Sequence, residues 1–179
     1  ASVVKELVEN SLDAKADRID IELTEGGKKF IAVTDNGIGI DPEQLLLAFK
    51  RFATSKISSF EDLNRIMSLG FRGEALPSIA AVARVNMVSR PAAQISGSLI
   101  EIAGGEIIST GTTGAPPGTR VEVKELFFNT PGRLKFLKTS SAESTKGSNL
   151  VSEMSLAHPE VSFSLKSGGR MLFKSEGVG

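Results

Sequence analysis

Three polar residues near the start of the chain have types and spacings that could support chemistry. Glu6, Asn10 and Asp13 lie four and three residues apart, so they share one face of a helix. A carboxylate one turn from a carboxamide can activate a water molecule, while the amide oxygen ligates a hard cation such as Mg²⁺. Lys5 and Glu9 lie beside them around the helix, so an ordinary solvated face is the alternative.

A second group follows a strand-like run in the stretch FIAVTDNGIGIDPEQ, residues 30–44. The run has apolar residues on both faces, which predicts a buried strand, and Asp35 at its end then needs a hydrogen-bond donor. Gly37 and Gly39 permit positive φ and leave no side chain between the backbone and a neighbour. This combination suits a flat heterocycle whose amino group bonds the carboxylate. A strand-to-helix connection with Asn-Gly turn chemistry is the alternative.

Further stretches carry groups that suit an anion. In GFRGEAL, residues 70–76, two glycines three apart lead into a helix start and can direct backbone N–H groups at a phosphate. The spacing matches neither a Walker loop nor G-x-G-x-x-G, so a generic glycine loop is the alternative. The stretch ATSK, residues 53–56, adds two hydroxyls and an ammonium group. Thr119 follows Gly118 where a strand opens, a pattern that also fits a turn alone.

The elements that must position these residues are predicted from hydrophobic periodicity and turn signals. An amphipathic helix over residues 2–14 carries the first group, and strands over 18–24 and 30–34 lead to the second. A helix is expected after the capping residue Asp41, ending near Phe52. The other expected elements are a short helix near 60–68, a loop over 70–76 running into a helix interrupted by Pro77, strands near 83–90, 96–103, 105–110 and 118–125, a helical piece in NTPGRLKFL, a mobile loop over 139–149, a helix near 150–157 and a hairpin over 161–175.

Element order and composition bound the class of protein. Helices come early and many antiparallel-looking strands follow, which predicts a two-layer α/β (α+β) sandwich rather than a βαβαβ array. The 179 residues suit one domain, and 21 basic against 21 acidic residues do not mark the whole chain as a nucleic-acid or membrane binder. The absence of cysteine excludes a disulfide framework and a thiolate metal site. Because the chain begins with Ala and stops just after a hairpin, we interpret it as a piece of a longer protein.

The motifs ELVENSLDA, DNGIGI, GFRGEAL and GTRVEV occur in an order that resembles the GHKL group of ATPases. This group holds gyrase B, heat-shock chaperones of the Hsp-ninety type and sensor histidine kinases. The stretches ATSKI, LGFRGEALPSIA and LFFNTPGRLKFL narrow the resemblance to the N-terminal ATPase domain of MutL-type DNA mismatch repair proteins. The resemblance implies the GHKL (Bergerat) ATP-binding fold, with a mixed, mostly antiparallel sheet and helices on one face.

The resemblance implies a role for each matching residue. Glu6 is expected to be the general base that activates the water attacking the γ-phosphate, and Asn10 to ligate Mg²⁺ between the phosphates. Asp13 is expected to help order the site. The residues expected near the phosphates are Thr54, Ser55 and Lys56, together with a lid of Gly70, Phe71, Arg72, Gly73, Glu74, Ala75 and Leu76 whose backbone amides wrap the triphosphate.

For the adenine base, the resemblance implies that Asp35 accepts a hydrogen bond from the amino group. Gly37 and Gly39 are expected to form the floor beneath the ring, and Thr119 to support the adenine contact through water. The implied function is ATP binding and hydrolysis as the nucleotide switch of mismatch repair, with ATP and Mg²⁺ as cofactors. The implied partners of the intact protein are DNA, a mismatch-recognition protein and a second copy that dimerises on ATP binding.

The resemblance also sets expectations for the whole protein. Residues 1–179 are expected to form one GHKL ATPase domain truncated at its N-terminus, without the second (transducer) domain and the C-terminal dimerisation domain. We expect weak hydrolysis by this chain alone. No apolar run approaches the ~20 residues of a membrane span, so no membrane partner is expected. The expected location is the bacterial cytoplasm, acting at the nucleoid, or the nucleus of a eukaryote.

Two other functions fit the same residues. One is another GHKL activity, of the topoisomerase or kinase type, although His158 beside Pro159 does not suit the phosphoacceptor of a kinase. The other is a DNA-binding or partner-docking module with a non-hydrolysing nucleotide site. Its basic residues would be Arg120, Lys124, Arg133, Lys135, Lys138 and Lys146, although a solvated mixed face is the simpler interpretation of that region.

Overall fold

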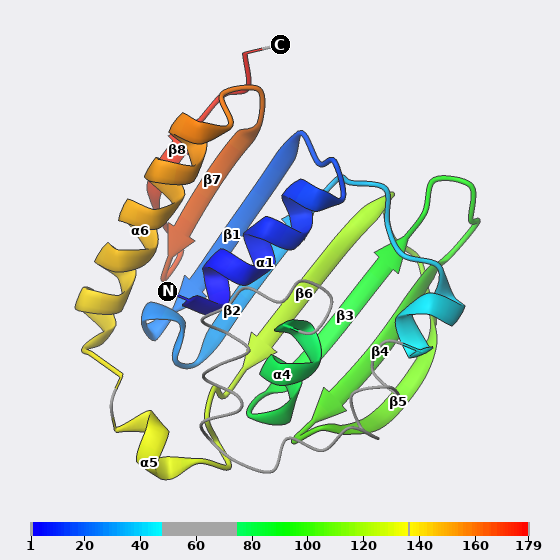
Figure 1. Cartoon of the computed structure of the whole chain (residues 1–179), viewed down its shortest axis with the longest axis horizontal. Coiled ribbons are helices and arrows are strands. Elements are labelled where there is room, and N and C mark those ends of the chain that lie inside the picture. The colour runs from blue at the N-terminus through cyan, green and yellow to red at the C-terminus, as the bar shows by residue number, and fades with distance from the viewer. Residues whose placement is uncertain (1, 48–74, 136, 179) are drawn as a thin grey trace.

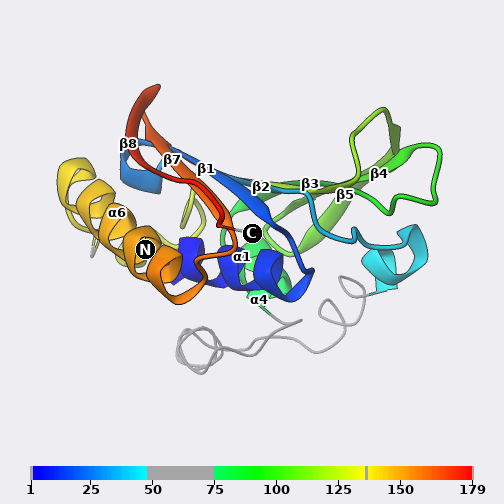
Figure 2. The same ribbon diagram turned by 90° about the horizontal axis from the view of Figure 1, so that it is seen from above.

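A single eight-stranded sheet organises the computed structural model, which describes residues 2–47, 75–135 and 137–178. The helices α1 (Ser2–Asp13), α4 (Ala75–Ala81) and α6 (Ser140–Ala157) lie on one face of this sheet (Figures 1 and 2). The strands are β1 (Arg18–Thr24), β2 (Phe30–Asp35), β3 (Arg84–Arg90), β4 (Gly97–Ala103), β5 (Glu106–Thr113), β6 (Gly118–Lys124), β7 (Ser162–Ser167) and β8 (Arg170–Ser175). Two short helices, η1 (Glu25–Gly27) and α5 (Pro131–Leu134), lie in connections.

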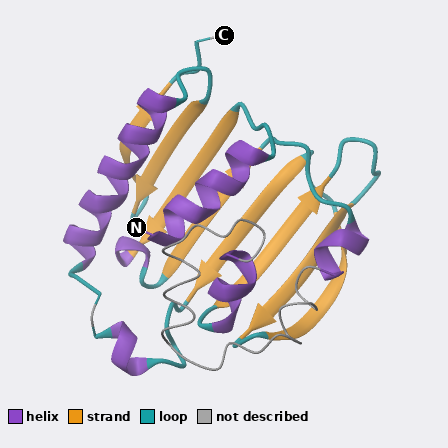
Figure 3. Cartoon of the chain, viewed as in Figure 1, coloured by secondary structure: helices purple, strands orange, loops and turns teal. Residues whose placement is uncertain are grey.

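The sheet is mixed, and its strands follow the order β5-β4-β3-β6-β2-β1-β7-β8. Neighbouring strands are antiparallel except β1 and β7, which run parallel with Ile19 opposite Phe163. Figure 3 shows the two layers by their colours, with strands behind and helices in front. The predicted two-layer α/β sandwich with a mostly antiparallel sheet is therefore confirmed, and the predicted strands are present, with β5 extending three residues beyond the expected end.

The core lies between the sheet and the helices. Alternate residues of β1, among them Ile19 and Ile21, are fully buried against the helical layer, as the period of two predicts. Leu7 and Val8 of α1 face them and are equally buried. Because each such side chain contributes about 1.5–3 kcal/mol on burial, this packing fixes α1 across the centre of the sheet.

The observed helices around the glycine motifs agree only in part with those predicted from the sequence. Residues 42–47 are helical after Asp41, whose carbonyl accepts the Leu45 N–H at 2.9 Å. The continuation toward Phe52 and the expected helix near 60–68 lie outside the described residues. The prediction that Pro77 interrupts a helix is wrong, since α4 runs from Ala75 through Ala81. Pro77 occupies its first turn, where a helix needs no intrahelical N–H donor.

The prediction of a mobile loop over residues 139–149 is also wrong, because α6 begins at Ser140. The Thr139 hydroxyl caps this helix by accepting the Ala142 N–H at 3.2 Å. Its buried residues are Glu143, Gly147 and Val151, so the first half of the inward stripe lacks the apolar residues on which periodicity depends. Among the described residues, no helix is long and apolar enough to cross a membrane.

Candidate functional site

Asp35 ends a buried central strand and keeps a charged group close to the core. β2 lies between β1 and β6 in the middle of the sheet, and Asp35 is only 9% exposed on the face that the helices cover. Ser11 of α1 donates its hydroxyl to Oδ2 at 2.6 Å, and the Gly37 N–H donates to Oδ1 at 2.9 Å. These are the donor partners that burial of a carboxylate requires. Each oxygen retains a lone pair for a further donor.

A cavity of about 310 Å³ opens beside this carboxylate. Its polar contributors include Asn10, Ser11 and Asp35, while most of its wall is aliphatic. An apolar cavity with a few convergent polar groups is the usual form of a small-molecule site. The lining residues are Leu7, Asn10, Ser11, Asp13, Ala14, Val33, Asp35, Ile40, Gln44, Leu45, Leu76, Pro77, Met87, Thr119 and Val121. Five residues predicted from the sequence therefore meet at one cavity: Asn10, Asp13, Asp35, Leu76 and Thr119.

Glu6 lies one helical turn before Asn10 on α1. Its side chain is 3% exposed, which excludes the solvated-face alternative for Glu6, whereas Asp13 is exposed at the cavity edge. In the part of the chain that the structure describes, no group of three or more histidine, cysteine or acidic residues could hold a metal ion. A cation at Asn10 would therefore take its other ligands from a bound molecule and water, as Mg²⁺ commonly does.

Thr119 lines the cavity beside Asp35, on the neighbouring strand. The two residues are register partners in the antiparallel pair β2–β6, so their side chains lie on the same face of the sheet. Ser89 of β3 continues the row, and its Oγ lies 2.7 Å from Thr119 Oγ1. The Ile40 N–H donates to Ser89 Oγ at 2.8 Å, which ties the glycine-containing connection to β3.

The glycines of the DNGIGI motif pack against this chain's own backbone. A Cβ on Gly37 would lie 2.6 Å from the Ala14 carbonyl oxygen. Gly39 has φ +74°, and its Cβ would lie 2.5 Å from the carbonyl group of Arg90. Both positions thus require glycine for packing, independently of the predicted floor beneath a ring, which stays a prediction.

The remaining predicted residues divide into two groups. Ala75 opens α4, and Leu76 in the same turn lines the cavity. Thr54, Ser55 and Lys56, and Gly70, Phe71, Arg72, Gly73 and Glu74, lie outside the described residues.

The structure adds three polar residues that the sequence analysis did not single out. Ser11 is hydrogen-bonded to Asp35, and Ser89 is hydrogen-bonded to Thr119, as described above. Asn36 accepts the N–H groups of Asp17 and Arg18, each at 3.0 Å, and so fixes the α1–β1 connection beside Asp35. The adjacency of Ser11 to Asn10 on one helix was the available signal, whereas the other contacts depend on strand register.

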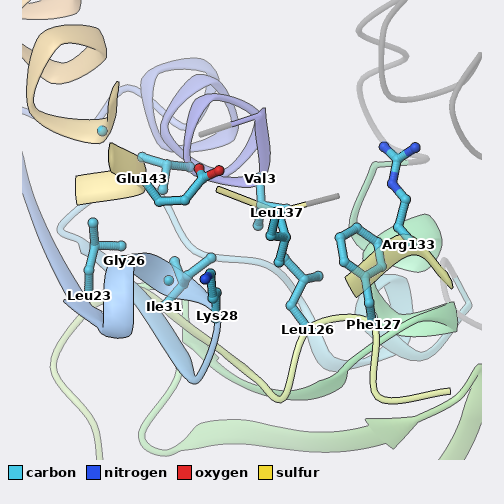
Figure 4. A pocket seen from close by; sticks show the side chains of 13 residues that line it. Val3, Leu23, Gly26, Lys28, Ile31, Leu126, Phe127, Arg133, Leu137 and Glu143 are labelled. Carbon is cyan, nitrogen blue, oxygen red and sulfur yellow. The ribbon is translucent and has the colours of Figure 1, made fainter. Parts of the chain in front are cut away.

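A second cavity, of about 280 Å³, lies among the N-terminal ends of α1 and α6, η1 and the connection after β6 (Figure 4). None of the residues predicted for the nucleotide site lines it, whereas Arg133, a basic residue of the alternative DNA-binding function, does. The Arg133 guanidinium lies 5.3 Å from the centre of the Phe127 ring, and Glu143 accepts the Lys138 N–H at 3.1 Å. Arg133 and Glu143 are thus engaged in local contacts, and we place the functional site at Asp35.

The basic residues of the 120–146 region lie on several elements. Arg120 and Lys124 belong to β6, whereas Arg133 belongs to α5 and Lys146 to α6. Arg120 donates to Thr34 Oγ1 at 2.7 Å, and its guanidinium lies within 4 Å of two carboxylates, at 3.9 Å from Glu22 and 3.7 Å from Glu122. Its charge is therefore balanced on the uncovered face of the sheet.

Comparisons with known proteins agree with this site. The chain is 54% identical over 178 residues to the DNA mismatch repair protein MutL of Desulforamulus reducens and 52% identical over 179 residues to that of Symbiobacterium thermophilum. The matches include 99% and 100% of this chain, respectively, but the chain spans only 28% of the length of each relative. The resemblance to MutL proteins predicted from the motifs is thus confirmed.

A solved structure with the same architecture is the Aquifex aeolicus MutL ATPase domain complexed with ADP. It matches with a TM-score of 0.83 and 40% identity, covering 99% of this chain and 63% of that one. A family model described as histidine kinase-, DNA gyrase B- and HSP90-like ATPase matches residues 1–103, which include Glu6, Asn10 and Asp35. The chain therefore belongs to the histidine kinase-, DNA gyrase B- and HSP90-like ATPase family.

Proposed function

We propose that this chain binds ATP in the cavity beside Asp35 and that the intact protein hydrolyses it as the nucleotide switch of a MutL-type mismatch repair protein. The observation that carries the proposal is Asp35 itself, a carboxylate held by Ser11 and Gly37 at the edge of a largely apolar cavity. The similarity to a MutL ATPase domain complexed with ADP supports a nucleotide as the ligand.

The cavity suits the adenine base. Asp35 accepts hydrogen bonds through the lone pairs that Ser11 and Gly37 leave open, so it can bind an exocyclic amino group. Side chains such as Ile40 and Met87 supply apolar wall for the faces of the ring. The predicted water-supported contact from Thr119 would reach the same edge of the base as the Asp35 carboxylate, because the two residues are register partners.

The phosphates would lie toward the α1 residues that precede Ser11. Asn10 offers an amide oxygen at the cavity, which fits the single protein ligand that Mg²⁺ needs beside nucleotide phosphates. Bound Mg²⁺ would supply charge neutralisation between those phosphates. Glu6, one turn away and buried, would hold and activate the attacking water. Asp13 at the cavity edge would help to order the site.

Partners follow from the family and belong to the same proposal. We propose that the intact protein dimerises on ATP binding and works with a mismatch-recognition protein and DNA, in the bacterial cytoplasm or in a eukaryotic nucleus. Residues 70–76 are proposed as the lid, and Thr54, Ser55 and Lys56 as phosphate contacts. Residues 1–179 are proposed to form one ATPase domain of a longer protein.

The decisive experiment is a titration of the intact protein with a non-hydrolysable ATP analogue, with and without Mg²⁺. Asp35→Asn places an amide donor against the donor amino group of adenine and should abolish measurable binding. Glu6→Ala should keep binding and lose hydrolysis, because it removes only the water-activating group.

Asp20→Asn is the matched control, since Asp20 lies one strand away, on β1, and bonds Arg18 and Ser164. It should bind and hydrolyse like the unmodified protein. Normal binding by Asp35→Asn would overturn the assignment of the adenine site. Normal hydrolysis by Glu6→Ala would overturn the assignment of Glu6 as the general base.

A further inference from the structure

The connection that follows β6, residues 125–130, belongs to the LFFNTPGRLKFL stretch, to which the proposed function gives no role. Two of its residues have left-handed backbone although neither is glycine: Glu125 has φ +53° and Phe127 has φ +64°. Phe127 is also buried, with 4% of its surface exposed. A bulky residue rarely adopts this conformation, and such strain persists only where surrounding contacts hold it. The connection must therefore be held by contacts that offset the strain.

The contacts of this connection are made with the C-terminal end of α4. The Phe127 N–H donates to the Val82 carbonyl oxygen at 2.6 Å. The Asn129 side-chain amide donates through Nδ2 to the Ala81 carbonyl oxygen at 3.0 Å. The direction of both bonds is fixed, because a carbonyl oxygen can only accept. Residues 125–130 thus bind two successive carbonyl groups at the point where α4 ends.

These bonds satisfy carbonyl groups that the helix itself leaves open, since the last four carbonyls of an α-helix have no intrahelical partner. The Ala80 carbonyl accepts the Gly105 N–H of the β4–β5 turn at 2.9 Å, so a second connection holds the same end. Donors at this end also suit the negative pole of the helix dipole. Directional bonds therefore fix the end of α4, in addition to the burial of Ile79 in the core.

The opposite end of α4 lines the cavity beside Asp35. Leu76 and Pro77, in the first turn of the helix, form part of the cavity wall. The helix has seven residues and is about 10 Å long. A shift or tilt at its C-terminal end therefore moves the two residues at the cavity.

We propose that Asn129 is a positioning residue for nucleotide binding, because its bond to the end of α4 fixes Leu76 and Pro77 at the cavity wall. The inference rests on the proposed function. Asn129 is not among the described residues that line the cavity, so it acts through the helix. Its side chain is exposed, and a substitution there removes the bond to Ala81 without opening the core.

The test uses the intact protein, titrated with a non-hydrolysable ATP analogue, and hydrogen exchange of the amides of residues 79–82. Asn129→Asp keeps the shape of the side chain but places a carboxylate against the Ala81 carbonyl oxygen. Affinity should fall about tenfold and exchange should accelerate. Asn129→Ala removes the donor without adding repulsion, so affinity should fall about threefold. Asn129→Gln retains an amide donor on an exposed side chain and should keep most of the affinity.

Leu76→Ala tests whether the effect passes through α4. It removes part of the wall that Asn129 positions, so Asn129→Asp should lower affinity less in this background than alone. Asn149→Ala is the matched control, since Asn149 is an exposed asparagine on α6. Its substitution should leave both the affinity and the exchange of residues 79–82 unchanged.

The outcomes separate the inference from the proposed function. Faster exchange with unchanged affinity in Asn129→Asp would make Asn129 merely structural and overturn the inference. Full additivity with Leu76→Ala would also overturn it, because the loss would then not pass through the helix. Absence of binding by the unmodified protein would overturn the proposed function together with the inference.

Discussion

The Ser11 hydroxyl donates to Asp35 Oδ2 at 2.6 Å, joining the middle helix of one layer to the central strand of the other. The Gly37 N–H holds the second carboxylate oxygen at 2.9 Å. The carboxylate is therefore oriented before any ligand arrives. Pre-orientation of this kind reduces the entropy that ordering a binding group would otherwise cost.

Ser11→Ala should weaken both the fold and nucleotide binding. It removes a donor from a buried carboxylate, which should lower the free energy of unfolding by about 1–3 kcal/mol and ATP-analogue affinity by about tenfold. Urea denaturation and titration measure the two effects. Ser155→Ala is the control, since the Ser155 hydroxyl only donates to Ser152 within α6, at 2.7 Å. Equal binding losses in the two variants would mean that Ser11 does not act through Asp35.

Asn36→Asp should be destabilising because of its neighbour Asp17. Asn36 Nδ2 donates to Asp17 Oδ1 at 2.6 Å, so the substitution places two carboxylates in contact. The site is exposed, and we expect a loss of about 1 kcal/mol that diminishes in high salt. Adding Asp17→Asn restores a donor opposite the new carboxylate and should recover most of the loss. Urea denaturation at two salt concentrations checks this, and failure of the double variant to recover stability would contradict the role of the pair.

Gly118→Ala should be severely destabilising, whereas Gly111→Ala should not. Gly118 has φ +125°, and a Cβ there would overlap the carbonyl oxygen of Asp35. Strain and overlap together should cost about 2–5 kcal/mol and displace the end of β2. A Cβ on Gly111 of β5 would have nothing within 4 Å, so its substitution should stay within about 0.5 kcal/mol. Thermal or urea denaturation of the two variants makes the comparison.

The sequence predicted the parts of the molecule where local pattern and tertiary role agree. Periodicity located α1 and β2, and burial then explains why Asp35 needed a donor. The donor itself, Ser11, was not identified, because helical spacing does not specify which residue faces a strand 24 positions away. Ser89 was missed for the same reason, since strand register places it beside Thr119.

The start of α6 was missed for a different physical reason. A helix can be recognised when its inward face is apolar, but the inward face here passes through Glu143 and Gly147 before reaching Val151. Small and polar residues are sufficient for packing on this part of the inward face of α6, because η1 lies close to it. The cap residue Thr139 is a local signal for this helix start, but a threonine followed by small polar residues is equally typical of a loop.

Two glycines, one where η1 meets α6 and one where α6 meets β1, should respond to substitution by alanine with opposite signs. Gly26 has φ +68°, and a Cβ there would lie 2.5 Å from the Ser140 carbonyl oxygen, so Gly26→Ala should cost about 2–4 kcal/mol. A Cβ on Gly147 would meet only Leu23 Cδ1, at 3.3 Å, the end of a side chain that can shift by a few tenths of an ångström. Alanine also stabilises a helix interior by up to about 1 kcal/mol over glycine, so Gly147→Ala should be neutral or stabilising. Urea denaturation measures both signs, and a loss of more than about 1 kcal/mol in Gly147→Ala would show that α6 packs against the sheet more tightly than this contact allows.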